Sequence, residues 1–323
     1  MSLSRKTGSV NTSPHSPADS RGIQPASRRR HRQEKMMFGL MTLGMLLVIV
    51  PTLYIFGSIV VGGWRQITPE FLTQAPRNGG AEGGIGPAIV GTLSLMVGTI
   101  VLALPLGVFA AIYLTEYARK GRLVRLIHLA IVNLAGVPSI VHGLFGLVLF
   151  KLFFGRLMDG FYHNQTPIWQ NRTLLWGAAT LAILVLPIVI TATEEALQSV
   201  PKSFREGSVG LGASRWQTIQ RVILPAALPG ILTGGILAVG RAAGETAPIL
   251  FTAAVSFTTL SGVPHLYDPV FALPYHLYYV VTQVANAPLQ LQYGIALTLL
   301  LLVFLVNLSA ILLRGRLRRA RRW

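Results

Sequence analysis

The sequence predicts an all-α protein that crosses a membrane six times. Hydrophobic residues make up 52% of the 323 residues and charged residues 12%, about half the charged share of soluble domains. Six long apolar segments fall at about 36–61, 87–114, 126–150, 173–193, 225–253 and 291–313. Each supplies the roughly 20 residues that a helix needs to cross the hydrocarbon layer. Because lipid offers the backbone no hydrogen-bond partner, we expect each segment to be a helix.

The basic residues predict how the chain threads through the membrane. Of the 28 Lys and Arg, 22 fall in 1–35, 116–125, 194–224 and 314–323, which lie on one side of a six-helix threading. The positive-inside rule then places both termini in the cytoplasm. The net charge of +17 is therefore interpreted as an orientation signal and as contact with membrane lipid, rather than as a nucleic-acid site.

This threading divides the chain into three parts. Residues 1–35, rich in Ser, Pro and Arg, are expected to form a disordered basic cytoplasmic leader, which is not a cleavable signal peptide. Residues 36–313 form the six-helix membrane domain, and 314–323 form a basic cytoplasmic tail. The third apolar segment is the least regular, because Pro138 interrupts it and Asn133 and His142 lie within it.

The sequence lacks the signatures of an enzyme. It has no cysteine, no phosphate-binding P-loop, and neither the H-E-x-x-H nor the G-x-S-x-G pattern of hydrolases. A polar residue such as His142 in a membrane segment more often bonds a neighbouring helix than performs chemistry. We expect no metal, no cofactor and no catalytic residue in this chain.

The loop 194–224 carries the signals of two short helices. Ser203 and Glu206 have the spacing of a capping box, in which the serine caps backbone donors and the glutamate reaches back. The first helix should stop at Gly210 or Gly212, since glycine accepts the left-handed backbone that ends many helices.

A second capping box, Ser214 to Gln217, predicts another helix that leads through Leu224-Pro225 into the fifth membrane segment. The loop also carries an apolar face, made of Phe204, Val209, Leu211 and Trp216. Such a face meets either a partner protein or the membrane surface, and the residues alone do not decide between these alternatives.

Two ionisable residues lie deep in the fifth apolar segment. Arg241 and Glu245 are four residues apart, so a helix would place them on one face near the middle of the membrane. Each costs about 2.5–3.5 kcal/mol to insert, so both should face the bundle interior or a wet cavity. They form either an ion pair that fixes helix packing or an anion pathway, which we favour, with Thr246 as a secondary polar contact. Nearby rows of small residues predict close packing of this helix between subunits or transport halves.

The loop resembles the signature E-A-A-x-x-x-G-x9-I-x-L-P of ABC-importer permeases. The residues that align with its fixed positions are Glu206, Gly207, Ser208, Gly212, Val222, Leu224 and Pro225. Three positions depart from the pattern, because Gly207 and Ser208 replace the two alanines and Val222 replaces isoleucine. Three further stretches, 135–147, 240–254 and 271–280, are similar to the PstA-type permease of bacterial phosphate-uptake ABC transporters.

The resemblance implies a type I ABC-importer permease in the bacterial inner membrane. Its partners would be a homologous PstC-type permease, two copies of an ATP-binding subunit that holds ATP and Mg, and a periplasmic phosphate-binding protein. The loop would dock on the ATP-binding subunit through Ser203, Phe204, Glu206, Gly207, Ser208, Gly212, Ser214, Trp216, Leu224 and Pro225. The family's arginine and glutamate in G-R-A-x-G-E-T fall on Arg241 and Glu245.

Other functions remain open at this point. The chain could be the PstC-type partner, or a permease for another oxyanion such as sulfate, because a bidentate arginine does not distinguish these tetrahedral anions. It could instead be a membrane scaffold that does not conduct, which would tolerate loss of both Arg241 and Glu245. A secondary transporter is disfavoured, because the sequence has no detectable internal repeat.

Overall fold

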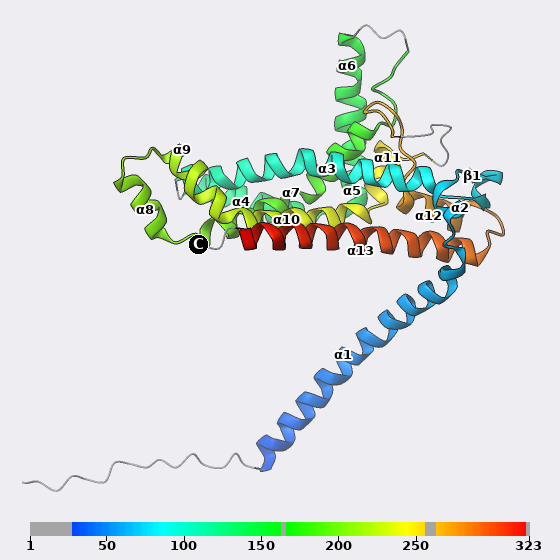
Figure 1. The fold of residues 1–323 in the computed structure, drawn as a ribbon, viewed down its shortest axis with the longest axis horizontal. Helices are drawn as coiled ribbons and strands as arrows, with labels where there is room; N and C mark the ends of the chain where they lie inside the picture. Colours follow the sequence, from blue (N-terminus) through cyan, green and yellow to red (C-terminus); the bar gives the residue numbers. More distant parts are fainter. Residues whose placement is uncertain (1–27, 120, 163–165, 256–262, 321–323) are drawn as a thin grey trace, which may run out of the picture. The chain divides into compact units, whose positions relative to one another are not determined.

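The structure is a computed structural model that describes residues 28–119, 121–162, 166–255 and 263–320. The described chain is mostly helical, and its one small sheet pairs β1 (Pro76–Arg77) antiparallel with β2 (Glu82–Gly83). Figure 1 shows the order of the elements along the chain. Six helical stretches are long and apolar enough to cross a membrane: Gln33–Gln66, Gly86–Tyr117, Ser139–Phe161, Leu174–Gln198, Arg215–Ala243 and Leu289–Arg316. The predicted all-α, six-span architecture is confirmed.

The chain divides into two compact units, residues 1–57 and 58–323. The described part of the first unit is helix α1 (Arg28–Gly63), which continues into the second unit. The predicted leader therefore needs a correction, because its residues 28–35 are helical. Arg, Gln, Glu and Lys dominate this stretch, and all of them favour helices. The rest of the leader lies outside the described residues, and the predicted tail continues helix α13 as far as Ala320.

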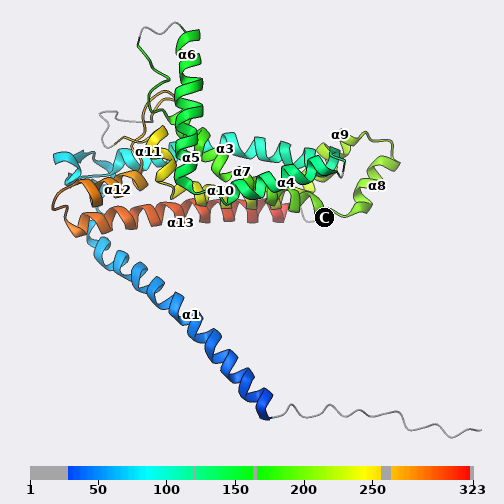
Figure 2. The same ribbon diagram turned by 180° about the vertical axis from the view of Figure 1, so that it is seen from behind.

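The core of the second unit is built around helix α7 (Leu174–Gln198). It packs against α3 (Gly86–Ile112) and α10 (Leu224–Ala243), and α10 also packs against α13 (Leu289–Ala320). Figures 1 and 2 show these helices side by side from opposite directions. Val185 and Val189, at the centre of α7, are fully buried. Because lipid is as apolar as these side chains, close van der Waals packing between them, and not the hydrophobic effect, holds the membrane helices together.

Small residues set the distance between α10 and its neighbours. A Cβ added at Gly230 would lie 2.5 Å from the Cβ of Ala196, and one at Gly234 would lie 2.6 Å from that of Ala192. Both alanines belong to α7 of the same chain. The prediction was that small residues pack this helix between subunits or transport halves. At Gly230 and Gly234 the close packing is against α7 of the same chain, so these two glycines do not join separate subunits.

The third membrane span differs from the prediction of 126–150. Helix α4 (Arg122–Ala135) ends before Pro138, and a new helical stretch begins at Ser139. Pro138 has no N–H and disfavours a helical backbone at Val137, so the chain breaks there. The span then continues through α5 (Ser139–Gly146), the π-helical η4 (Leu147–Phe154) and α6 (Gly155–Phe161). As a result, Lys151 lies within a membrane span and not in a loop.

The remaining elements join the spans or form their ends. The ends of spans include η1 (Trp64–Gln66), the π-helical η3 (Tyr113–Tyr117), α9 (Arg215–Thr218) and the π-helical η5 (Ile219–Ile223). Between spans lie α2 (Pro69–Thr73), η2 (Asn78–Gly80), α8 (Lys202–Gly210), α11 (Ala247–Thr252) and α12 (Leu273–Gln283). Thr92 of α3 accepts a hydrogen bond from the backbone N–H of Leu273 at 2.9 Å, which fixes the start of α12 against the core.

Candidate functional site

The predicted fifth segment is broken at the residues that carry its charges. Helix α10 ends at Ala243, and α11 begins at Ala247 with Pro248 in its first turn. The N–H groups of Gly244 and Glu245 reach back to the carbonyls of Arg241 and Ala242 at 3.4 and 3.3 Å. The prediction of one continuous helix over 225–253 is therefore wrong, since the chain makes a turn between two helices.

Arg241 and Glu245 nevertheless lie together at this break. Nε of Arg241 is 3.7 Å from Oε1 of Glu245, and 40% and 18% of the two side chains are exposed. Arg241 occupies the last turn of α10, where the carbonyl end of the helix dipole favours a cation. The two side chains thus form an ion pair, and the guanidinium is open on a side that no described part of this chain covers. Whether the pair fixes helix packing or belongs to an anion pathway stays a prediction.

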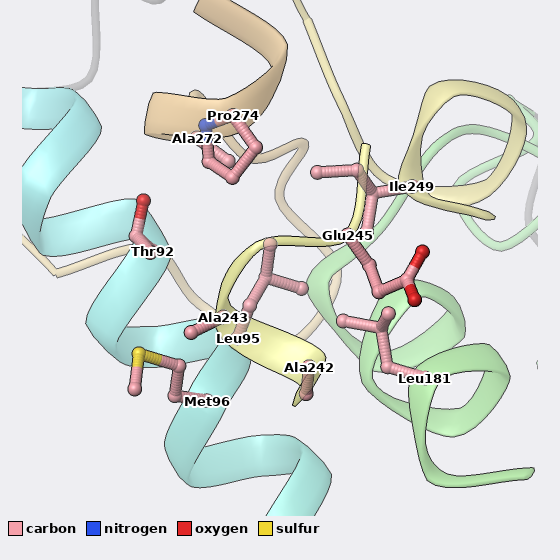
Figure 3. A pocket seen from close by; sticks show the side chains of 10 residues that line it. All are labelled: Thr92, Leu95, Met96, Leu181, Ala242, Ala243, Glu245, Ile249, Ala272 and Pro274. Atoms are coloured by element: carbon pink, nitrogen blue, oxygen red, sulfur yellow. The ribbon is translucent and has the colours of Figure 1, made fainter. Parts of the chain in front are cut away.

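Glu245 also borders a narrow recess of about 10 Å³, which has room for about one water molecule. Figure 3 shows it between α3, which contributes Thr92 and Met96, and α7, which contributes Leu181. The hydroxyl of Thr92 is already engaged, since it donates to the carbonyl of Ala88 at 2.7 Å and accepts from Leu273. Glu245 is therefore the ionisable group at this recess, and the other residues lining it are largely apolar.

Thr246 lies at the N-cap of α11, where its side chain makes no capping hydrogen bond. It is partly buried and follows Glu245 directly, so it lies beside the charged pair along the chain. Its expected part as a secondary polar contact stays a prediction.

The loop between α7 and α10 forms the predicted helix, glycine turn and helix. Gly212 has φ +85°, a left-handed conformation that glycine adopts without strain. Ser214 accepts a hydrogen bond from the N–H of Gln217 at 3.3 Å, and Gln217 accepts one from the N–H of Ser214 at 2.8 Å. The second predicted capping box is therefore confirmed.

The first predicted capping box is wrong. Helix α8 begins at Lys202 with Pro201 at its N-cap, and no side chain caps it. Because Ser203 lies inside the first turn, its hydroxyl is not at the position from which it could cap the helix as predicted. Glu206 points its side chain to solvent. Both residues thus remain exposed on α8.

The apolar face of this loop is exposed, as predicted. Phe204, Val209 and Trp216 are about half exposed, and Leu211 is 92% exposed. An open recess of about 410 Å³ lies beside this face and is lined by Ser203, Phe204, Gly207, Ser208, Leu211, Ala213 and Val222. Apolar exposure on this scale beside a groove is typical of a surface that binds a partner.

The loop is anchored to the membrane domain at its far end. Ser208 and Thr218 share a hydrogen bond at 3.0 Å, which holds α8 against α9. Ile219 and Ile223 are buried in the core, so the second helix is fixed to the membrane domain. Leu224 then begins α10, with Pro225 in the first turn, where proline is well tolerated.

Two features of the site were not predicted. Arg205 of α8 forms an ion pair with Glu116 of η3 at 2.9 Å, and Lys151 lies within the third span. Residues 205 and 116 are 89 positions apart, so no local pattern in one sequence could pair them. Lys151 could have been found only by placing the break at Pro138 correctly.

The chain matches a known protein family over most of its length. Residues 103–323 match the model of the binding-protein-dependent transport system inner membrane component. The chain is 33% identical over 304 residues to the phosphate transport system permease protein PstA 1 of Mycobacterium tuberculosis, covering 93% of each chain. It is 32% identical over 249 residues to the PstA protein of Haemophilus influenzae, covering 77% of this chain and 82% of the relative.

A relative in Bacillus subtilis carries a broader name. The chain is 32% identical over 260 residues to its probable ABC transporter permease protein YqgI, covering 77% of this chain and 84% of the relative.

Solved structures agree on the fold. A bacterial ABC transporter involved in alginate import matches with a TM-score of 0.59 and 14% identity, covering 89% of this chain and 99% of that one. The MetNI methionine ABC transporter matches with a TM-score of 0.51 and 18% identity, covering 72% and 94%. The six spans, the broken fifth segment and the exposed loop thus occur in a fold shared with ABC-importer permeases. This multi-pass membrane chain belongs to the family of binding-protein-dependent transport system inner membrane components.

Proposed function

We propose that this chain is a permease subunit that forms part of the channel for inorganic phosphate import. The observation that carries the proposal is its similarity, over nearly the whole chain, to permeases named for phosphate transport. The same similarity favours the PstA type over the PstC-type partner. The exposed Arg241 beside Glu245 supplies a cation that can bind the phosphate anion.

Arg241 would act as the fixed cation that the anion passes. Its guanidinium offers a planar set of donors that suits two phosphate oxygens at once. Glu245, at 3.7 Å, offers a competing acceptor, so a phosphate ion is held weakly enough to be released. The turn between α10 and α11 supports this role, because broken helices in transporters place charged groups and free backbone at the transport site.

The energy would come from ATP on a partner protein. This chain has no P-loop, so ATP and Mg would be bound by two copies of a separate ATP-binding subunit. One copy would bind the apolar face of α8 and α9, because Phe204, Leu211 and Trp216 are exposed there. Closure of that subunit can open the channel only if the loop binds its closed and open states with different affinities.

The rest of the assembly follows from the same proposal. Both termini would lie in the cytoplasm, because the excess of Lys and Arg marks that side. A homologous PstC-type permease would cover the exposed side of Arg241 and complete the channel. A phosphate-binding protein would deliver the anion to the opposite face and would contact the chain within 62–86 and 254–290.

Uptake by the reconstituted complex tests the proposal. The chain is purified with its permease partner and ATP-binding subunit, placed in vesicles with the binding protein, and given labelled phosphate or sulfate. We expect ATP-dependent uptake of phosphate in preference to sulfate. Preference for sulfate would reassign the substrate, and absence of any ATP-dependent oxyanion uptake would leave the scaffold function.

A further inference from the structure

Lys151 is an ionisable residue whose charge the described chain does not balance. It lies in the π-helical η4, within the third membrane span, and is partly buried. No carboxylate of the described residues lies within ion-pair distance of it. The neighbouring segments 163–165 and 256–262 contain no acidic residue either. An unpaired cation in a membrane span is costly, so its presence points to a function.

A second cation lines the same recess. Arg172, just before α7, borders with Lys151 an open recess of about 490 Å³, within the size range of small-molecule sites. Nη1 of Arg172 donates to the carbonyl of Ala254 at 3.2 Å, which holds the guanidinium in place. Arg172 is close enough to Lys151 to repel its charge. The other residues that line the recess are Pro167, Ile168, Asn171, Val255, Tyr267 and Pro269.

The nearby backbone does not supply the positive charge. The first N–H groups of α7 already have acceptors, since those of Thr173, Leu174 and Leu175 donate to carbonyls at 2.8–3.0 Å. The N–H of Trp176 donates to the hydroxyl of Thr173 at 3.1 Å. An anion in the recess would therefore be held by the two side chains.

The acidic side chains that contact the segments lining the recess are engaged. The carboxylate of Asp159 accepts the backbone N–H groups of Ile168, Trp169 and Gln170 at 3.0 Å. The backbone carbonyl of Asp268 accepts the N–H of Leu174 at the start of α7, and the carboxylate of Asp268 accepts the N–H of His265 at 2.8 Å. Two like charges are thus held together at an open recess, and neither has a carboxylate partner. An anion that enters would relieve their repulsion and gain charge-assisted hydrogen bonds from both.

We infer that Lys151 and Arg172 form an outlying oxyanion site that binds a phosphate group. The inference rests on the proposed function, since it places this site upstream of Arg241 on the face that receives the imported anion. Two sources can supply such a group, namely free phosphate on its way to the channel and the headgroup of a membrane lipid. In the first case the two cations raise the local phosphate concentration at the channel mouth.

Chemical protection of Lys151 tests binding without relying on transport. The assembled complex is placed in nanodiscs of neutral phosphatidylcholine and treated with an amine-acylating reagent, and the labelled peptide is quantified by mass spectrometry. We expect inorganic phosphate to protect Lys151, and Arg172→Gln to remove that protection. If discs of anionic phosphatidylglycerol protect Lys151 and added phosphate does not, the site stands with a lipid headgroup as its ligand. Protection by neither source overturns the site.

Uptake kinetics test whether the site serves import. Lys151→Met and Arg172→Gln should each raise the KM for phosphate, together by about tenfold at low salt, and less at high salt, where charge attraction is screened. Arg156→Gln is the matched control, since Arg156 is an exposed cation of the same span and does not line the recess. If the KM is unchanged and neither phosphate nor phosphatidylglycerol protects Lys151, the inference is defeated while import by the wild type stands. Conversely, a wild type that imports no phosphate but shows protection defeats the proposed function and leaves the site.

Discussion

Arg205 of helix α8 donates a hydrogen bond from Nη2 to Oε1 of Glu116 at 2.9 Å, which joins the exposed loop to the end of α3. The same guanidinium donates to the carbonyls of Leu197 at 2.8 Å and Val200 at 3.3 Å, at the end of α7. One side chain therefore connects α8 to two membrane spans. A displacement of the loop by a partner would be passed to both spans through this connection.

Arg205→Met should weaken the coupling between ATP hydrolysis and uptake. Hydrogen bonds to charged groups contribute about 1.5–3 kcal/mol each, and the substitution removes three from the loop. We expect the partner subunits to hydrolyse ATP but to import less phosphate per ATP. The measurement is the ratio of uptake to hydrolysis in vesicles, with Arg215→Met on exposed α9 as the control. An unchanged ratio would show that the connection carries no coupling.

Arg241→Gln should abolish phosphate uptake and leave the complex assembled. The substitution removes the fixed charge and the planar fork, while the remaining amide preserves much of the side-chain length. Arg241→Lys keeps the charge without the fork, so it should restore uptake only partly. Uptake is measured in vesicles, and assembly by co-purification with the ATP-binding subunit. Normal uptake by the Gln variant would refute the pathway role.

A double substitution separates a permease from a scaffold. Arg241→Gln combined with Glu245→Gln removes both members of the ion pair, so no unpaired charge is left behind. A scaffold should keep its thermal stability and its partners under this change. A phosphate channel should lose uptake while it stays folded, as measured by thermal unfolding and uptake on the same preparation.

Much of the architecture could be predicted from the sequence, because hydrophobic length and the bilayer constraint act on each segment separately. The glycine turn at Gly212 and the capping box at Ser214 could be predicted for a similar reason, since both depend on neighbouring residues. The box at Ser203 failed because the N-cap is Pro201, so the helix begins two residues earlier than predicted. Local chemistry thus determined that a helix would form, and proline determined its boundary.

The site was harder to predict, since its parts depend on contacts between distant segments. Arg241 and Glu245 were paired correctly, but the break between them follows from Gly244 and Pro248 acting together. The link between Arg205 and Glu116 depends on how α3 and α8 pack, which one sequence does not reveal. The partner of the small-residue rows could not be predicted either, because such a row shows that a helix packs closely but not against which helix, as the contact of Gly234 with α7 illustrates.

Leu211→Asp should prevent binding of the ATP-binding subunit without unfolding the permease. Leu211 is 92% exposed at the glycine turn, so a carboxylate there meets water in the free chain. In a complex the same carboxylate would be buried against an apolar groove, which is costly without a partner charge. Co-purification measures the loss, and Gln220→Asp, on the polar exposed side of the same loop, should bind normally. Binding by the Leu211 variant would place the docking surface elsewhere.

Two glycine substitutions should have opposite effects on stability. At Gly207 an added Cβ meets nothing within 4 Å, so Gly207→Ala should stabilise α8 by up to about 1 kcal/mol. At Gly234 the added Cβ would lie 2.6 Å from Ala192, so Gly234→Ala should force α10 away from α7 and cost about 1–3 kcal/mol. Thermal unfolding of the two purified variants, compared with the wild type, measures both changes in stability. Equal stabilities would contradict the close packing of α10 on α7.

The stability of the part of the chain that contains helix α12 should depend on pH through His276. This side chain is almost completely buried, packs against Phe271 with ring centroids 4.7 Å apart, and leaves its Nδ1 without a described partner. Burial lowers the pKa of His276 from 6.5 to about 4, because the charged ring would lose its hydration. The folded chain therefore holds a neutral imidazole at neutral pH.

The unfolded chain takes up this proton near pH 6.5 and the folded chain only near pH 4, so the unfolded state binds more protons between these values. The free energy of unfolding should have its full value above pH 6.5 and fall by up to about 3 kcal/mol as the pH drops toward 4. In His276→Gln this loss should disappear, because glutamine does not titrate. Melting temperatures from pH 7.5 to 4.5 measure the effect, with exposed His265→Gln as the control. If the wild type and His276→Gln lose stability in parallel over this range, the buried imidazole is not the group that senses pH.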